Sequence, residues 1–200
     1  MQTSTIIGVA LIAVSLLLIS IGLFHKKEAF FNLRDIVKNH LTIFENSRMN
    51  YVVFYVLPAL FAAGLSLLYS AATEFYTELS VILGILLSVL LTILSILSNY
   101  DFSTVTDEQQ KEKAKEVVEQ TINAITFSAL LCIFLLLYNL TLIIVRSYDF
   151  TWITWDLSFI KAIISAIAYY VFAVICLNLL LVVKQMSKII QFNLNVKKGS

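Results

Sequence analysis

Charged side chains are missing from five long stretches of this 200-residue chain. The charge-free cores are Ile6–Leu23, Tyr51–Tyr69, Leu79–Ser98, Ile125–Val145 and Ile163–Val183. Each is close to the roughly 20 residues that cross a hydrocarbon layer about 30 Å thick as a helix. With 60% hydrophobic and only 14% charged residues, the composition excludes an ordinary soluble globular protein. The chain is therefore expected to lie in the lipid bilayer.

We predict an all-α, polytopic membrane bundle of five transmembrane helices. Their expected ranges are 5–24, 51–70, 79–99, 124–145 and 160–183. The connections are too short for a separate soluble domain, and helices satisfy their own backbone hydrogen bonds within lipid. One membrane domain is expected over residues 1–198, with 199–200 as an appended linker.

The sequence also lacks the residues that intramembrane chemistry requires. No Asp or Glu lies in a core, His25 and His40 stand alone, and Cys132 and Cys176 fall in apolar runs where thiols behave as small hydrophobes. No HExxH, GxSxG, paired-cysteine or glycine-rich phosphate motif is present. These absences argue against an enzyme, and no metal or other cofactor is expected.

Proline and ionisable groups are too scarce in the cores for a coupled transporter. Such transporters place ionisable side chains or broken helices at the midplane, and the cores offer only Pro58 as a kink. Five helices do not divide into two equal halves, and no internal repeat is evident. Alternating access is therefore not expected.

The basic residues that are present lie between the cores and favour one side. One set of loops carries twelve of them, whereas the other set carries only Arg146 and Lys161. The twelve are Lys26, Lys27, Arg34, Lys38, Arg48, Lys111, Lys113, Lys115, Lys184, Lys188, Lys197 and Lys198. Because basic loops stay in the cytoplasm, the 25–50 and 99–124 loops and the carboxyl terminus are predicted inside. The amino terminus is predicted outside, and the first core is interpreted as a retained anchor because no positive charge precedes it.

The third core carries a row of small and polar residues that we call the polar stripe. Its members recur at spacings of 4, 4, 4, 3 and 4, which places them on one helix face: Ser80, Gly84, Ser88, Thr92, Ser95 and Asn99. Two interpretations remain open. Such rows let membrane helices pack closely. In a symmetric oligomer, the same face would line a narrow, uncharged pore whose hydroxyls replace part of an ion's hydration.

Shorter polar rows are expected to pack against the polar stripe. They are Ser128, Cys132 and Asn139 in the fourth core and Ala162, Ser165, Ala166, Ala173 and Asn178 in the fifth. The first core adds a shallow seam with a spacing of seven, formed by Gly8, Ser15 and Gly22. Several such seams favour a bundle that also self-associates.

An amphipathic helix is predicted over residues 28–45. Its apolar residues recur at spacings of 3, 4, 4 and 3 and are Phe30, Leu33, Val37, Leu41 and Phe44. Its basic residues are Lys26, Lys27, Arg34 and Lys38. The helix is expected either to lie on the inner leaflet with these cations near lipid phosphates, or to offer a docking face to a cytosolic partner.

A cytoplasmic stalk is predicted over residues 107–123, directly before the fourth core. The stretch from Lys111 to Gln120 is rich in Lys, Glu and Ala, so the fourth helix is expected to extend about 25 Å beyond the membrane at 1.5 Å per residue. In an oligomer the stalks would form a vestibule. The basic tail after Lys184 continues the fifth helix, and a nucleotide or oligonucleotide ligand is a minor alternative that no phosphate-binding motif supports.

The order of these parts resembles the small multi-pass membrane components of bacterial anti-phage defence operons, namely Kiwa-type membrane subunits and Hailong-type channel effectors. The parts concerned are the helix from Phe30 to Phe44, the hairpin from Tyr51 to Asn99 with Pro58, and the stalk that runs into Ile125–Val145. The resemblance lies in organisation and transfers no role to a single residue. It implies a homo-oligomer, a tetramer, in the bacterial inner membrane, together with a soluble cytosolic partner protein.

Two classes of function follow. The first is a gated pore in which the polar stripe conducts when the stalks rearrange, depolarising the membrane of an infected cell. The second is a non-conducting sensor or scaffold that holds and regulates a cytosolic defence protein through the 25–50 and 101–124 segments. Substitution of Ser88 and Thr92 by Leu should abolish conduction in the first case and leave partner binding intact in the second.

Overall fold

Four helices in the computed structural model are long and apolar enough to cross a membrane: Met49–Leu68, Thr73–Ser98, Glu108–Val145 and Phe159–Gln191. The structure describes residues 7, 8, 11, 14, 15, 33–42, 48–69, 72–102, 108–146 and 158–199, and no strand occurs among them. The all-α class is thereby confirmed. Of the predicted first span, 5–24, only residues 7, 8, 11, 14 and 15 are described, so that span stays a prediction.

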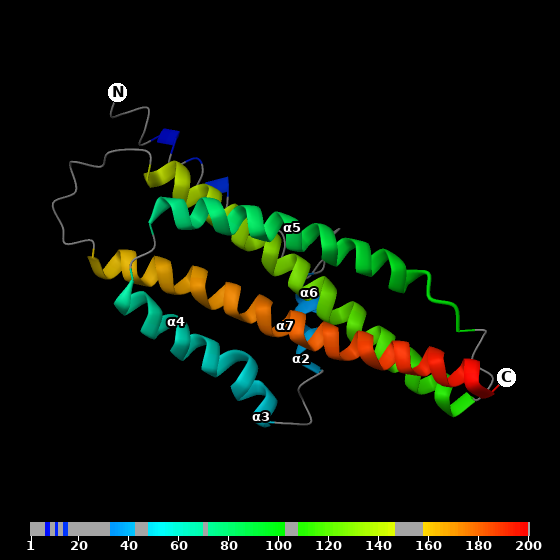
Figure 1. Ribbon diagram of the computed structural model, residues 1–200. Helices are drawn as coiled ribbons and strands as arrows, with labels where there is room; N and C mark the ends of the chain where they lie inside the picture. Colours follow the sequence, from blue (N-terminus) through cyan, green and yellow to red (C-terminus); the bar gives the residue numbers. More distant parts are fainter. Residues whose placement is uncertain are drawn as a thin grey trace.

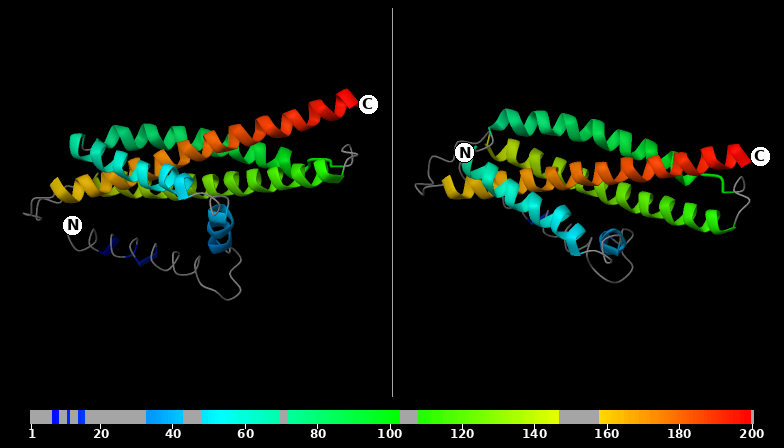
Figure 2. Two further views of the ribbon diagram at one scale, coloured as in Figure 1. Left: turned by 90° about the horizontal axis from the view of Figure 1, so that it is seen from below. Right: turned by 60° about the horizontal axis from the view of Figure 1, so that its bottom comes forward.

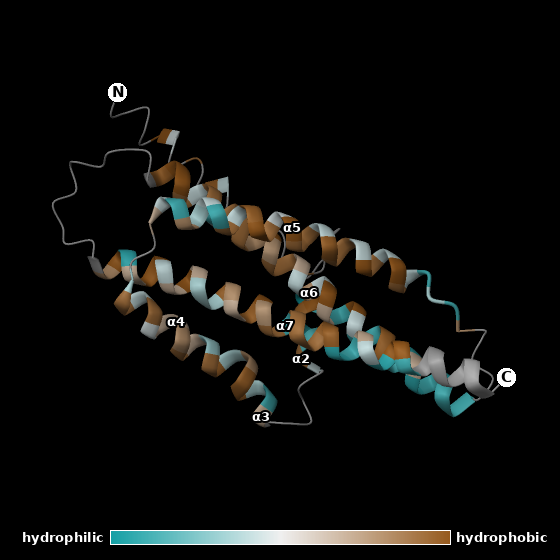
Figure 3. Cartoon of the chain, in the orientation of Figure 1, coloured by the Kyte–Doolittle hydropathy of each residue, from teal (hydrophilic) through white to brown (hydrophobic). Residues whose placement is uncertain are grey.

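The elements follow one another as a series of helices (Figure 1): α2 (Leu33–Thr42), α3 (Arg48–Tyr51), η1 (Val52–Val56), α4 (Leu57–Leu68), α5 (Thr73–Ser98), α6 (Glu108–Arg146) and α7 (Ser158–Gly199). Helix α5 begins six residues before the expected 79, and α7 runs on from the expected 183 through the basic tail. A charge-free window measures only the hydrocarbon-embedded part, whereas a helix continues beyond it where Glu, Lys and Gln reach water. Figure 3 shows this pattern, with hydrophilic residues gathered towards the ends of the long helices.

A π-helical turn, η1, precedes Pro58 in the second predicted span. Within it, the N–H of Leu57 donates to the carbonyl of Val52, five residues back, instead of to the residue four back. Proline has no N–H, so it fits best in the first turn of a helix, and α4 begins there. The residue that was predicted to kink this span therefore marks a change of helix type.

Helix α6 packs along both α5 and α7 and runs antiparallel to them (Figure 1). Their shared core follows a repeat of seven residues, the pattern of left-handed coiled-coil packing. On α6 eight of the buried residues alternate at spacings of 4 and 3: Ala114, Val118, Thr121, Ile125, Ser128, Cys132, Leu135 and Asn139. Ala124, Phe127 and Ala129 are buried beside this series. The matching series at a spacing of seven are Tyr76, Leu83, Leu90 and Leu97 on α5, and Ala168, Ile175, Val182 and Ile189 on α7.

The remaining helices attach to this core from outside. Helix α4 packs on α7. Helix α2 packs on α6 and runs crosswise to the long helices (Figure 2). That orientation is the one expected of an interfacial helix beside membrane-spanning ones.

The predicted stalk is one half of a helix pair. Helix α6 has 39 residues and α7 has 42, so at 1.5 Å per residue they are about 58 and 63 Å long, roughly twice the hydrocarbon thickness. Where α6 begins, it packs along the tail of α7: Val118, Val182 and Ile189 share the buried core, and Gln185 Nε2 donates to Gln120 Oε1 at 3.4 Å. The tail of α7 thus supports the stalk.

Candidate functional site

The polar stripe lies on the face of α5 that points away from the three-helix core. Gly84, Ser88, Thr92, Ser95 and Asn99 are all exposed. The opposite face buries leucines against α6, namely Leu79, Leu83, Leu90 and Leu97. Large apolar residues are exposed on α5 beside the stripe as well, namely Val81, Ile82, Ile85, Val89, Leu91 and Ile96. The stripe is therefore a row of small and polar residues within an otherwise apolar surface, a pattern common where membrane helices pack together.

Hydrogen bonds within α5 satisfy donors of the stripe. Thr92 Oγ1 donates to the carbonyl of Ser88, and Asn99 Nδ2 donates to the carbonyl of Ser95, each at 2.9 Å. Because a hydroxyl oxygen carries two acceptor lone pairs, these bonds leave the oxygen able to face a cation or a donor. Space is also free at Gly84, where an added Cβ would meet nothing within 4 Å. The stripe thus has short side chains and free space beside Gly84, so another helix or an ion can approach it.

Ser80, the first member of the stripe, belongs to a different environment. Its hydroxyl donates to the Tyr76 carbonyl at 2.8 Å and accepts from Asn139 Nδ2 at 3.3 Å. The Tyr76 hydroxyl lies 3.3 Å from Ser165 Oγ, so one polar cluster joins α5, α6 and α7. The short polar rows of α6 and α7 therefore reach the stripe only at this end, and the expected packing along its whole length is not found within the described chain.

Asn178 occupies the core without such partners. Its side chain is fully buried, and neither its Oδ1 nor its Nδ2 has a hydrogen-bond partner among the described residues. It lies seven residues before Gln185, which contacts Gln120, so the antiparallel register places it level with Phe127 of α6. A polar amide is thus held at the middle of the bundle, in surroundings of low dielectric constant.

The apolar face of the predicted amphipathic helix is turned towards the protein. Leu33 is buried, Val37 is half-buried and Leu41 is exposed. Arg34 and Lys38 are exposed and available to lipid phosphates or to a partner. The other predicted members, Phe30, Phe44, Lys26 and Lys27, lie outside the described residues.

His40 connects α2 to α6, and this role was not predicted. The side chain is fully buried, and its ring stacks on Phe127 with 4.0 Å between centroids and 10° between planes. Burial disfavours the charged imidazolium and lowers the pKa of His40 from 6.5 to about 4. The sequence did contain a signal, since His40 follows Leu33 by seven residues and therefore shares its face. This contact joins α2 to α6 near the predicted junction of stalk and span.

Groups suited to catalysis or metal binding do not converge in the part of the chain that the structure describes. No set of three or more His, Cys, Asp or Glu that could hold a metal ion is found there. Cys132 is buried in the bundle, Cys176 is half-buried, and both are free thiols. The features left to carry function are the polar stripe, the buried polar cluster and the docked α2.

Comparisons with protein-family models, curated proteins and solved structures find no match to this chain.

Proposed function

We propose that the chain is a subunit of a homo-oligomeric, gated membrane pore lined by the polar stripe of α5. The observation that carries the proposal is the exposure of Gly84, Ser88, Thr92, Ser95 and Asn99 as one polar row on α5, outside the core that α5 forms with α6. A face of glycine, hydroxyl and amide groups is a poor match for lipid and a good one for a second helix or for hydrated ions. Several copies that turn this face towards a common axis would enclose an uncharged polar passage.

Control from the cytoplasm fits the way the other elements attach. Helix α6 forms the stalk with the tail of α7, carries α2 through the His40–Phe127 contact, and packs along α5. A partner that moved α2 or the stalk would therefore act on the helix that supports the stripe. Coupling of this kind requires that the partner bind one arrangement of the stalk more tightly than the other.

The proposed setting is the bacterial inner membrane, where such a pore would depolarise an infected cell as part of anti-phage defence. A tetramer and a soluble cytosolic partner complete the proposal, and both rest on the resemblance in organisation. The amino terminus outside and the carboxyl terminus inside are part of it, supported by the distribution of Lys and Arg.

Ion flux into liposomes tests the pore directly. Purified protein is reconstituted with and without cytosolic extract, and wild type is compared with the double variant Ser88→Leu/Thr92→Leu. Ile85→Leu/Val89→Leu is the matched control, because both residues are exposed on α5 beside the stripe. We expect flux to fall by about tenfold or more in the stripe variant, since leucine removes the oxygens that replace hydration, and to persist in the control. Equal flux in the two variants would show that ions do not pass along the stripe.

A second candidate is a non-conducting sensor or scaffold that binds a cytosolic defence protein. The observation that favours it is the position of α2, which packs on α6 through His40 and leaves Arg34, Asp35 and Lys38 exposed. Absence of flux under every condition, combined with loss of partner capture in Arg34→Ala/Lys38→Ala, would select this alternative. Retained capture in Ser88→Leu/Thr92→Leu would agree with it.

A further inference from the structure

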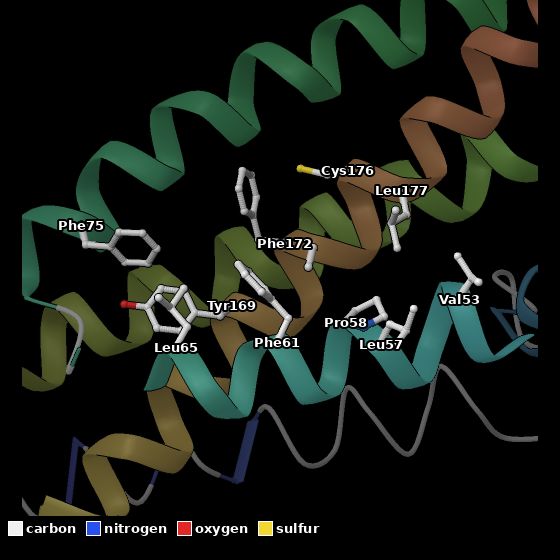
Figure 4. Close-up of a pocket in the computed structure, with 11 residues that line it drawn as sticks. Val53, Leu57, Pro58, Phe61, Leu65, Phe75, Tyr169, Phe172, Cys176 and Leu177 are labelled. Carbon is white, nitrogen blue, oxygen red and sulfur yellow. The ribbon is translucent and has the colours of Figure 1, made fainter. Parts of the chain in front are cut away.

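An apolar cavity of about 550 Å³ lies between α4 and α7, next to the start of α5 (Figure 4). Its walls include Leu57 and Phe61 on α4, Phe75 on α5, and Phe172, Ala173 and Cys176 on α7. The volume is within the range of about 300–1,000 Å³ that small-molecule sites occupy. No charged residue lines it.

The position of the cavity determines what can fill it. Helices α4 and α7 both belong to membrane-spanning segments, Met49–Leu68 and Phe159–Gln191, so the medium beside the cavity is lipid hydrocarbon. A hydrophilic solute would lose its hydration there and find no charged side chain in return. An acyl chain restores the dispersion contacts that facing apolar walls would otherwise lack. The occupant is therefore a hydrocarbon chain.

The charge at one end of α7 selects the kind of lipid. Lys184 follows Leu177 by seven residues and Ala173 by eleven, which places it on the face of α7 that lines the cavity. Lys188 follows one turn later, and both lysines are exposed. At 1.5 Å per residue, Lys184 lies about 10 Å beyond Leu177, within reach of a headgroup whose chain enters the cavity. On α7 it is the first charged residue after Lys161.

We propose that the crevice between α4 and α7 binds an anionic glycerophospholipid. One acyl chain fills the apolar cavity, and the phosphate pairs with Lys184 and Lys188, where lysines near a membrane surface attract anionic lipid. The site lies on the side of α7 that meets α4 and uses no residue of the polar stripe. It is therefore independent of the proposed pore and can be tested without measuring conduction.

Native mass spectrometry of the full chain, released from nanodiscs of mixed phosphatidylglycerol and phosphatidylethanolamine, measures the bound lipid. Ala173→Trp fills the cavity, and Ile167→Trp is the control because Ile167 is exposed on another face of α7. We expect retained phosphatidylglycerol to fall by about tenfold in Ala173→Trp and to be unchanged in Ile167→Trp. Equal retention in the two variants would overturn the site.

Lysine substitutions separate recognition of the headgroup from filling of the cavity. Lys184→Gln/Lys188→Gln should abolish the preference for phosphatidylglycerol over phosphatidylethanolamine, whereas Lys161→Gln at the opposite end of α7 should keep it. An unchanged preference in the double variant would contradict the proposed headgroup contact.

Thiol labelling gives a second measurement that needs no bulky substitution. In a Cys132→Ala background, Cys176 in the cavity wall is the remaining cysteine. Addition of phosphatidylglycerol should slow its reaction with a membrane-permeant maleimide by about tenfold, since an acyl chain would cover the sulfur. A rate that does not respond to this lipid would overturn the proposal even if Ala173→Trp fails to fold.

Discussion

Two buried amides in the bundle differ in their hydrogen bonding, and this difference should be measurable. Asn139 donates to Ser80 Oγ at 3.3 Å and to the Tyr76 carbonyl at 3.5 Å, whereas Asn178 has no such contact among the described residues. A buried amide without partners costs free energy that an apolar side chain of similar volume does not. The two positions thus provide a matched pair on neighbouring helices.

We expect Asn178→Leu to raise the free energy of unfolding by about 1–2 kcal/mol, because it removes an unsatisfied amide from the core. Asn139→Leu should lower it by about 0.5–1 kcal/mol, because it breaks contacts between helices. Thermal unfolding in detergent, followed by circular dichroism, measures both. Destabilisation by Asn178→Leu would mean that the Asn178 amide makes a favourable interaction that the described contacts do not include.

His40 makes the docking of α2 sensitive to acid. Its pKa is about 4 in the folded protein and 6.5 when exposed, so the undocked state binds the proton more readily. The full contribution of this contact to the free energy of α2 docking is present above pH 6.5. It decreases as the pH drops from 6.5 to about 4 and is constant below that. The shift corresponds to about 3 kcal/mol when fully expressed.

Hydrogen exchange of the α2 amides at pH 7 and pH 4.5 should therefore show faster opening at the lower pH, after correction for intrinsic exchange rates. His40→Phe keeps an aromatic ring on Phe127 and cannot be protonated, so its α2 should open equally at both values. Persistent acid sensitivity in His40→Phe would assign the effect to another group.

At the scale of elements, the stalk depends on pairing between α6 and α7. Val118 is buried in the seam with Val182, whereas the adjacent Glu119 is exposed. Val118→Lys should cost about 2–3 kcal/mol, because it loses apolar burial and places a charge in the seam. Glu119→Lys should change stability by less than about 0.5 kcal/mol. Protease cleavage between 108 and 123 measures the effect, and similar cleavage of both variants would argue against a paired stalk.

At the scale of the whole molecule, the charge distribution predicts which end of the bundle faces the cytoplasm. In a chain with Cys132 and Cys176 replaced by Ala, a new cysteine is placed at Ala72 or at Lys113, both exposed at opposite ends of the bundle. A membrane-impermeant maleimide added to intact spheroplasts should label Ala72→Cys and not Lys113→Cys until the membrane is permeabilised. The reverse pattern would invert the topology.

The sequence by itself determined that the chain is helical and contains segments long and apolar enough to cross a membrane, since charge-free runs of about 20 residues have that length and composition. It also located the polar stripe, because helical periodicity needs only spacing. The orientation of that stripe could not be predicted, since in lipid both faces of α5 are apolar enough to be outside and hydropathy does not distinguish them. On α6 the sequence analysis predicted part of the buried seam as a packing row, Ser128, Cys132 and Asn139, whereas Ala114 and Thr121 on the same seam were not predicted.

Tertiary structure alone decided which helices meet. It paired the α7 tail with the stalk, placed His40 on Phe127, left Asn178 without a hydrogen-bond partner among the described residues, and formed the cavity between α4 and α7. Each of these depends on contacts between residues distant in sequence, which no local pattern encodes. Hydropathy indicates whether a segment lies in lipid or in water, whereas side-chain packing decides which other helices it contacts.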